Sequence, residues 1–565
     1  MKQKKRQKAV ADRGYPRPML VRDSFDTLDG TWDFALDPDA RCSRPDQVDF
    51  NQEIRVPFAP ESPASGIHHT GYFLACWYRR TFTAPSLAAN QRLIIHFGAV
   101  DYQARVWVNG RLAAEHEGGY CPFCADITDL LVEGSQTVVV QALDDPHDMS
   151  KPRGKQDWLP EAHSIWYWRT SGIWQSVWLE VVPAARIDHL RWTACVQDWQ
   201  IALDARLTGP VTNDMSLAVR LELNGVPLAA DTYSVSGPHV QRRIDLPDPG
   251  ISDARRKLMW SPQNPVLIDA HVHLLDADGN PIDSVRSYTA MREVGIHGTR
   301  FTLNGLPYKL RFVLDQGYWP EGGLTAPDDA AYRKDVELLK AMGFNGVRKH
   351  QKIEDPRFLY WADRLGLLVW EEMPSPYKFC PRAVERLSAQ WQQAIERDIS
   401  HPCIVAWVPF NESWGVPDLP LSLPQRHFVE GMYYLTKAID PTRPVVGNDG
   451  WEIGATDIIG IHDYERNPER LAVRYEQTAE SLQRLFEHER PGGRILLLEG
   501  VDHKDRPVML TEFGGIAFTR QKGAWGYSRA SSSSDLAARY GELLRHVRDL
   551  PLLSGFCYTQ FTDTY

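Results

Sequence analysis

The chain has 565 residues, of which 43% are hydrophobic and 24% charged, and its formal net charge is −10. A chain of this length exceeds what one hydrophobic core organises, so it predicts roughly three to four structural units. The negative charge argues against a nucleic-acid partner, because such partners need a basic surface. No run of about 20 apolar residues is present, so no membrane span is expected.

Residues 1–13 are basic but lead into no sustained apolar run, which a secretory signal requires. We therefore expect a disordered leader and a cytoplasmic protein; a periplasmic or secreted location stays open if the N-terminus is incomplete. Cys121-Pro-Phe-Cys124 matches a CxxC pattern, but no second CxxC or nearby His pair completes a metal site. We interpret both cysteines as ordinary strand residues.

Residues 14–183 and 184–294 are both typical of antiparallel β-sandwiches, because short apolar strands alternate with Gly, Pro, Asn and Asp. In the first range the expected strands include 92–97, 104–108 and 137–142, with a turn at Asn109-Gly110. The second range has strands at 187–192, 217–223 and 267–274, and its size fits one immunoglobulin-like sandwich. We expect boundaries near Pro183 and Gly295.

From residue 295 the pattern changes to short apolar strands alternating with amphipathic helices, which predicts parallel pairing. One expected helix carries Tyr332, Val336, Leu339 and Met342 on one face and stops at Gly343. Eight strands over about 260 residues favour a closed (β/α)8 barrel, residues 295–565, over an open doubly wound sheet, for which a GxGxxG turn is missing. The chain stops soon after strand eight, so we expect a barrel truncated there. The expected strands are 308–314, 344–348, 367–370, 404–409, 444–447, 457–461, 508–511 and 555–561.

Two glutamates stand where barrel strands end: Glu412 after the fourth strand and Glu512 after the seventh. Catalytic groups of such barrels lie at this face, and strands four and seven lie across the mouth from each other. A pair of carboxyl groups ~5–5.5 Å apart can hydrolyse a glycosidic bond with retention, one as acid/base and one as nucleophile. Simple pairing of both glutamates with arginines is the competing interpretation.

The two glutamates need different proton affinities. We expect donors from Tyr464 and Arg311 to lower the pKa of Glu512. We expect partial burial beside Trp414 and the charge of Glu512 to keep Glu412 protonated.

The motifs Asn411-Glu412-Ser-Trp-Gly and Thr511-Glu512-Phe-Gly-Gly, with the order of domains, resemble glycoside hydrolase family 2. Arg169-Thr-Ser-Gly-Ile-Trp-Gln and Met342-Gly-Phe-Asn-Gly-Val-Arg resemble the same family, which contains β-galactosidases, β-glucuronidases and β-mannosidases. The resemblance implies a jelly-roll sugar-binding domain, an immunoglobulin-like domain and a TIM barrel. It also implies that Glu412 is the acid/base, Glu512 the nucleophile, Asn411 the donor to the sugar 2-hydroxyl, and Tyr464 a donor to the nucleophile.

The chain departs from the family after its first two barrel strands, where it has Arg311-Phe-Val-Leu and Arg348-Lys-His-Gln-Lys-Ile. Because these loops bind the terminal sugar, the usual galactose contacts cannot be carried over. The chain also stops before the basic motif with which glucuronidases hold the carboxylate.

Further candidates are the strand-end acid Glu372, with hydrogen bonding through other residues favoured over direct contact, and His350 and His462 for sugar hydroxyls. Trp319 and Tyr558 are candidate sugar platforms. Structural hydrogen bonding or packing remains open for all of them. No trio of metal ligands stands out, so we assign no metal and no cofactor.

The function predicted from the sequence is a retaining exo-glycosidase that removes a terminal β-linked sugar, of the β-galactosidase or β-glucuronidase type. The expected partner is an oligosaccharide or glycoside, and a homo-oligomer stays open. The alternatives are a non-catalytic carbohydrate-binding protein on the same fold, and transglycosylation by the same residues.

Overall fold

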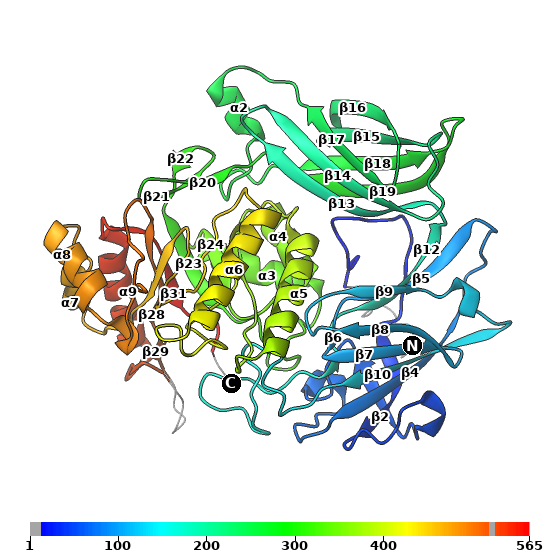
Figure 1. Cartoon of the computed structure of the whole chain (residues 1–565), viewed down its shortest axis with the longest axis horizontal. Coiled ribbons are helices and arrows are strands. Elements are labelled where there is room, and N and C mark those ends of the chain that lie inside the picture. Colours follow the sequence, from blue (N-terminus) through cyan, green and yellow to red (C-terminus); the bar gives the residue numbers. More distant parts are fainter. Residues whose placement is uncertain (1–12, 519–525, 564–565) are drawn as a thin grey trace.

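The computed structural model describes residues 13–518 and 526–563, and it comprises antiparallel β-domains followed by a parallel barrel (Figure 1). The expected leader lies outside the described residues except for Arg13, which donates to the carbonyls of Ala326 and Pro327. Among the helices that are described, none is both long enough and apolar enough to cross a membrane.

The first domain is a sandwich of a six-stranded and a four-stranded antiparallel sheet, with a short two-stranded pair beside them. The three strands that the sequence predicted here are confirmed as β5 (Gln91–Phe97), β7 (Gln103–Val108) and β10 (Ser135–Leu143). The six-stranded sheet has the order β3 (Gln52–Val56), β2 (Gly30–Asp37), β4 (Ala75–Thr83), β10 (Ser135–Leu143), β7 (Gln103–Val108) and β8 (Arg111–Glu117). The four-stranded sheet has the order β1 (Asp26–Thr27), β12 (Val177–Pro183), β5 (Gln91–Phe97) and β9 (Phe123–Asp126), and the short pair is β6 (Val100–Asp101) with β11 (Gly172–Ile173).

The second domain packs a three-stranded antiparallel sheet on a four-stranded one. Its strands alternate buried and partly exposed residues: β14 buries Ile201, Leu203, Ala205 and Leu207 against the facing sheet. The sheets are β13 (Arg186–Cys195), β14 (Gln200–Thr208), β17 (His239–Asp245), and β16 (Val226–Ser234), β15 (Ser216–Leu223), β18 (Ile268–Leu275), β19 (Pro281–Thr289), with the helix α2 (Ser252–Leu258) after β17.

A small sheet of β20 (Val294–His297), β21 (Arg300–Leu303) and β22 (Leu306–Pro307) leads into the barrel. Seven parallel strands form the barrel wall, and their nearly continuous burial is that of strands covered on both faces. The strand order is β26 (Ile404–Val408), β25 (Leu368–Glu372), β24 (Gly346–Lys349), β23 (Leu310–Asp315), β31 (Leu553–Thr559), β28 (Val508–Gly514) and β27 (Ile459–His462).

The outer helices begin and end where their capping residues predict. The Asp355 side chain accepts from the N–H of Arg357 at the start of α4, and Gly366 ends that helix in the left-handed conformation. The predicted face of α3 is confirmed for Tyr332, Val336 and Leu339, whereas Met342 follows the last turn and is exposed. The helices are α3 (Asp329–Ala341), α4 (Pro356–Leu365), α5 (Pro381–Asp398), α6 (Leu423–Ile439), α7 (Pro468–Arg474), α8 (Ala479–Gln483) and α9 (Ser533–Asp549).

The fifth predicted strand, residues 444–447, does not form a regular strand. The chain there makes isolated bridges only, from Val445 to Trp407 on one side and from Gly450 to Ile461 on the other. Two of its N–H groups donate to side chains, that of Val445 to Asp457 Oδ2 and that of Gly447 to Thr456 Oγ1, while that of Val446 donates to the carbonyl of Trp407. An irregular segment therefore fills the gap between β26 and β27.

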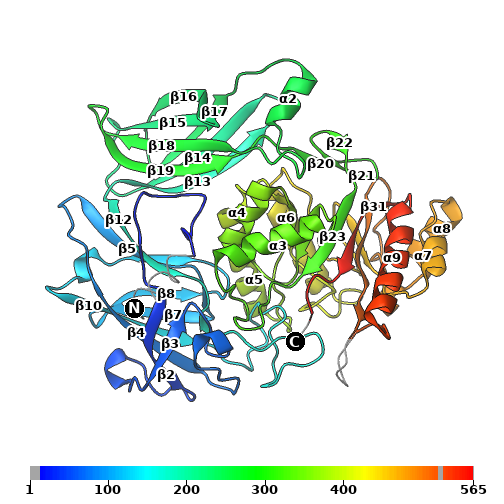
Figure 2. The ribbon, with the colours of Figure 1, turned by 180° about the vertical axis from the view of Figure 1, so that it is seen from behind.

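Both sandwiches pack against the barrel (Figure 2). The second sandwich contacts it where the N–H of Trp192 donates to Ser400 Oγ, 3.0 Å. A long loop between β10 and β11, drawn in cyan near the C-terminus in both figures, crosses from the first sandwich to the barrel. The N–H groups of Arg153 and Gly154 in this loop donate to the carbonyl of Ser375.

Candidate active site

Glu412 and Glu512 lie at the C-terminal ends of barrel strands and line one cavity of about 420 Å³. Glu512 lies in β28, and Glu412 lies four residues after β26. One carboxylate oxygen of each and one ring nitrogen of His462 all lie within 4.8 Å of one another. The nearest oxygens of the two carboxyl groups are thus no more than 4.8 Å apart, an approach that favours the ~5–5.5 Å carboxyl spacing of retaining glycosidases over the ~6.5–9.5 Å of inverting ones.

The buried guanidinium of Arg348, at the end of β24, holds the site together. It donates to Glu512 Oε1 (3.1 Å), Glu372 Oε2 (2.6 Å) and Asn411 Oδ1 (2.6 Å), and its Nη1 lies 2.8 Å from Asp449 Oδ2. A guanidinium with five donors in one plane is suited to such a convergence of acceptors. Burial raises the pKa of both Asp449 and Glu372, and Arg348 opposes it: with His462 it brings the pKa of Asp449 down to about 2, whereas the pKa of Glu372 stays raised.

The expectation that Arg311 donates to Glu512 is wrong. Arg311 is the second residue of β23, and its Nε donates to the carbonyl of Gly343. It therefore lies at the N-terminal end of the barrel, away from the mouth.

Tyr464, two residues after β27, donates its hydroxyl to Glu512 Oε2 at 2.5 Å, so this predicted contact is confirmed. Arg348 and Tyr464 thus occupy both oxygens of Glu512. Each partner stabilises the carboxylate in the orientation that faces Glu412.

Glu412 is held by His462 Nδ1 at 2.7 Å and by Trp414 Nε1 at 3.3 Å. Its backbone has a φ of +52°, a left-handed conformation that is strained for a residue other than glycine and common at functional sites. The loop after β26 therefore turns sharply at the carboxylate that faces the cavity.

The pKa of Glu412 moves in the direction opposite to the expected one. Burial raises this pKa, but the hydrogen bond and charge of His462, with the charge of Lys155, lower it below its usual value. His462 is itself a cation: burial lowers its pKa, and Glu512, Asp449 and Glu412 together raise it to about 10. Burial is thus the largest single influence, as expected, but His462, Lys155 and the hydrogen bond from Trp414 together outweigh it.

Asn411 is fully buried, and only one of its two side-chain amide atoms has a hydrogen-bond partner among the described residues. The Oδ1 atom accepts from Arg348, whereas Nδ2 has no hydrogen-bond partner among the described residues. The amide donor is thus oriented but unused. Its role toward the sugar 2-hydroxyl stays a prediction.

The remaining candidates separate into two groups. His350 and Tyr558 line the cavity with the glutamates. Glu372 and His462 are fully buried and engaged by Arg348, Glu412 and Asp449, so neither is free to bind a sugar hydroxyl. Trp319 is not among the described lining residues and packs edge-on against Tyr332 of α3, so it is not placed to be a sugar platform.

Three site residues escaped the sequence analysis: Arg348, Asp449 and Lys155. Arg348 follows the strand-end rule and could have been found by it. Asp449 lies in the irregular fifth segment, where no strand end marks it. Lys155 belongs to the loop of the first sandwich, yet it is 5% exposed and lines the same cavity. No local pattern signals that contact.

Glu412, His462 and Glu512 are close enough to hold a cation, and so are Asp363, His401 and Cys403. In the first group both oxygens of Glu512 accept hydrogen bonds from Arg348 and Tyr464, and Glu412 Oε1 lies 2.7 Å from His462 Nδ1. In the second group Asp363 Oδ2 already contacts His401 Nδ1 at 2.6 Å and accepts from the hydroxyl of Tyr288. Of the CxxC pair, Cys121 is buried and Cys124 exposed, and neither is in a disulfide.

Relatives of this chain include β-galactosidases and β-glucuronidases. The β-galactosidase of Thermoanaerobacter pseudethanolicus is 28% identical over 71% of this chain and 53% of its own length. The β-glucuronidase of Chlorocebus aethiops is 25% identical over 88% of this chain and 82% of its own length. The chain spans about half or less of several curated relatives, such as 38% of the Photobacterium profundum β-galactosidase.

A solved structure of Bifidobacterium dentium β-glucuronidase complexed with coumarin-3-O-glucuronide shares the fold. Its TM-score is 0.74 and its identity 21%, over 97% of this chain and 92% of that one. Two family models also match: "Glycosyl hydrolases family 2, sugar binding domain" over residues 68–183 and "Glycosyl hydrolases family 2, TIM barrel domain" over residues 295–525. The chain therefore belongs to glycoside hydrolase family 2.

Proposed function

We propose that the chain is a retaining β-glycosidase that removes a terminal sugar by double displacement, with Glu412 as acid/base and Glu512 as nucleophile. The observation that carries this proposal is the approach of the two carboxylates, with oxygens within 4.8 Å of each other in one cavity. A separation of this size leaves room for a covalent sugar adduct but not for a water between base and substrate.

In the first displacement a Glu512 oxygen attacks the anomeric carbon while Glu412 protonates the departing oxygen. Arg348 and Tyr464 hold the attacking carboxylate, so it needs no reorientation when the sugar binds. In the second displacement Glu412 removes a proton from the water that cleaves the glycosyl-enzyme ester.

Glu412 must carry a proton in the first step, although its pKa is lowered in the free protein. The cation responsible is His462, whose Nδ1 lies 2.7 Å from Glu412 Oε1. A substrate that excludes water from Glu412 raises its pKa, so Glu412 takes up its proton more readily in the substrate complex.

Asn411 supplies the donor for the sugar 2-hydroxyl in this proposal. Its Nδ2 is buried and unpaired among the described residues, and its Oδ1 is fixed by Arg348. An amide held in this way cannot rotate without losing a charge-assisted hydrogen bond.

For the sugar itself we propose a uronic acid. Lys155 is 5% exposed and faces the cavity, and no described residue pairs with its Nζ, whose recorded neighbour is the ring of Trp166 at 5.0 Å. The carboxylates of Glu412 and Glu512 attract Lys155 without contacting its Nζ. A buried ammonium without a hydrogen-bonded counter-ion is costly, and a substrate carboxylate would provide one, whereas a neutral galactoside would not.

A panel of nitrophenyl glycosides, including the β-glucuronide, β-galacturonide and β-galactoside, tests the function. We expect Glu412→Gln and Glu512→Gln to abolish most turnover, and the exposed control Glu499→Gln to keep it. Azide should rescue a Glu512→Ala variant to a glycosyl azide of inverted configuration. Binding of the glycosides without release of nitrophenol by the wild type would instead establish a carbohydrate-binding protein.

The same panel tests the sugar. Lys155→Met should lower kcat/KM for the uronides at least tenfold more than for the galactoside, since it removes a charge and keeps most of the side-chain volume. An equal loss on charged and neutral sugars would show that Lys155 acts on the glutamates and not on the substrate.

A further inference from the structure

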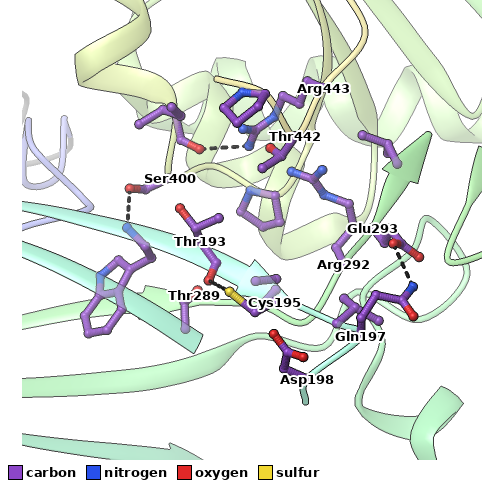
Figure 3. Close-up of a pocket in the computed structure, with 18 residues that line it drawn as sticks. Thr193, Cys195, Gln197, Asp198, Thr289, Arg292, Glu293, Ser400, Thr442 and Arg443 are labelled. Carbon is purple, nitrogen blue, oxygen red and sulfur yellow. Dashed lines mark hydrogen bonds between the residues drawn. The ribbon is translucent and has the colours of Figure 1, made fainter. Parts of the chain in front are cut away.

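A second cavity, of about 390 Å³, lies on the far side of the barrel from the two glutamates, between the barrel and the second sandwich (Figure 3). Its sandwich wall is formed by β13 with the turn after it and by the linker after β19. Its barrel wall is formed by segments that precede β26 and the irregular fifth segment, which places it at the N-terminal face. The lining residues are 192–198, 289, 290, 292–294, 399, 400, 402 and 441–443.

Arg292, in the linker, points its guanidinium into this cavity (Figure 3). The residue is 8% exposed, and its Nε is buried without a hydrogen-bond partner. Within residues 13–518 and 526–563, no carboxylate or carbonyl accepts from its guanidinium. A guanidinium stays charged at neutral pH, so this is a buried positive charge without a partner.

The acidic groups around Arg292 are engaged elsewhere. Asp440 Oδ2 accepts from Arg443 at 2.7 Å and from the indole of Trp407 at 2.8 Å. Glu293 accepts from Gln197, as Figure 3 shows, and Asp198 pairs with Arg243 at 3.2 Å.

Arg443 adds a second positive charge to the same region. Its remaining donors are spent on the carbonyls of Ile399, His401 and Ile404. Burial, and after it the charge of Arg443, lowers the pKa of Arg292 to about 9 against the attraction of Asp440. Because the acids of the lining and Arg443 are engaged elsewhere, the charge open to a ligand is that of the Arg292 guanidinium, and a buried unpaired cation favours an anion.

Hydroxyl groups complete the polar side of the cavity. Ser400 Oγ accepts from the N–H of Trp192, so its own hydrogen is available to a ligand. Thr193 lines the same wall (Figure 3). A guanidinium binds phosphate and carboxylate oxygens through its planar fork of N–H groups, and hydroxyl groups lining the same cavity can add further donors.

We propose that this cavity is a binding site for a small oxyanion, a phosphate or a carboxylate, held by Arg292 with Ser400 and Thr193. The ligand would contact the second sandwich and the barrel at once. Its binding would therefore stabilise the packing of these two domains against each other.

Titration calorimetry and thermal unfolding of the full chain test the proposal, with inorganic phosphate and malonate as probes at an ionic strength held constant with chloride. Phosphate alone indicates a phosphate site, malonate alone a carboxylate site, and either supports the proposal. We expect saturable binding and a rise in Tm with ligand concentration in the wild type. Both should disappear in Arg292→Met.

Two control variants separate this site from the rest of the molecule. Lys155→Met should bind the probe as the wild type does, because Lys155 lines the other cavity. The exposed Arg220→Met should also bind it normally and controls for net charge. If Arg292→Met does not fold, Arg292→Lys, which keeps the charge but loses the planar fork, should bind at least fivefold more weakly.

The proposal is overturned if the wild type shows no saturable binding of either probe, or if Arg292→Met binds as well as the wild type. Loss of binding in Lys155→Met but not in Arg292→Met would place the anion at the glutamates, which overturns this site and supports the uronide proposal.

Discussion

Replacing His462 by Asn is the perturbation that tests the proposed proton chemistry most directly. His462 is fully buried, and its Nδ1 lies 2.7 Å from Glu412 Oε1. Burial lowers the pKa of His462, but the carboxylates of Glu512, Asp449 and Glu412 raise it to about 10, so the ring is cationic through the neutral range. Asn keeps a polar group at this place and removes the charge.

The sign of the expected effect follows from which form of Glu412 the cation favours. A cation beside a carboxylate favours the ionised form, so His462 lowers the pKa of Glu412, as the structure indicates. An acid/base must be protonated to begin the first displacement, so its pKa in the free enzyme sets the basic limb of kcat/KM. Removing the cation therefore moves that limb to higher pH.

The magnitude follows from the distance. An opposite charge within ~4–6 Å shifts a carboxylate by about 1–3 pKa units, and each unit corresponds to about 1.4 kcal/mol. With the two groups 2.7 Å apart and buried, we expect the basic limb to rise by at least about one unit. The assay is kcat/KM against pH, from 4 to 10, on the best glycoside of the panel.

His350→Asn is the matched control. His350 lines the same cavity, but burial and the charge of Lys155 hold its pKa well below its usual value, so its ring is neutral. Its replacement changes no charge and should leave the basic limb in place. A limb that stays put or moves to lower pH in His462→Asn would refute the assignment of Glu412 as the acid whose pKa His462 controls.

Four further outcomes are expected. Tyr464→Phe removes a hydrogen bond to the carboxylate of Glu512, worth ~1.5–3 kcal/mol, so kcat should fall on the order of 10- to 100-fold with little change in KM; an unchanged kcat would contradict this role. In Gly154→Ala the new Cβ would lie 2.2 Å from the carbonyl oxygen of Gln351 in the barrel, at a φ of +60°. Activity should therefore drop, because the loop between β10 and β11 that carries Lys155 shifts. Gly110→Ala, at a φ of +78° with nothing within 4 Å, should cost stability of about 1 kcal/mol but no activity. Because folding raises the pKa of His462 from 6.5 to about 10, its contribution to stability is complete below pH 6.5 and is lost as the pH rises through 10; urea unfolding that shows no such loss would contradict the charged state of the ring.

The fold and the two glutamates were accessible from the sequence because both follow from local rules. Amphipathic helices between short apolar strands predict a barrel, and the barrel places its strand ends at one mouth. The wrong prediction for Arg311 shows that only residues at the very end of a barrel strand can be assigned to the mouth by this rule. The predicted strand ended at Leu314, but Arg311 is near its beginning, and the residue that ends β23 is Asp315, which pairs with Lys349 at 2.6 Å.

The proton affinities and the contribution of the first sandwich were not accessible in the same way. The pKa of Glu412 depends on His462, which lies 50 residues away in the chain. Lys155 reaches the cavity because a loop of the first sandwich docks on the carbonyl of Ser375 through Arg153 and Gly154. Neither contact leaves a periodic pattern, since each joins segments that meet only in the folded chain.

The irregular segment between β26 and β27 is where strand periodicity predicts the wrong structure. The same segment supplies Asp449, the anion that balances the cations of the site. A Cβ on Gly450 would lie 2.7 Å from His462 Nδ1, and one on Gly460 would lie 1.7 Å from Asp449 Oδ1. Both side chains therefore occupy space that only glycine leaves open. Asp449 then accepts from Thr511 at 2.8 Å and lies 3.2 Å from His462 Nε2, while Arg348 contacts it from the other side.

Asp449 fixes the orientation of the imidazolium that Glu412 depends on. Burial raises the pKa of Asp449, but Arg348, His462 and Thr511 lower it to about 2, so it stays ionised at every pH at which the site can work. A permanent anion on one ring nitrogen directs the other ring nitrogen to Glu412. A regular fifth strand with ordinary side chains would bury residues in the barrel wall, but it would leave no room for this chain of charges behind the acid/base.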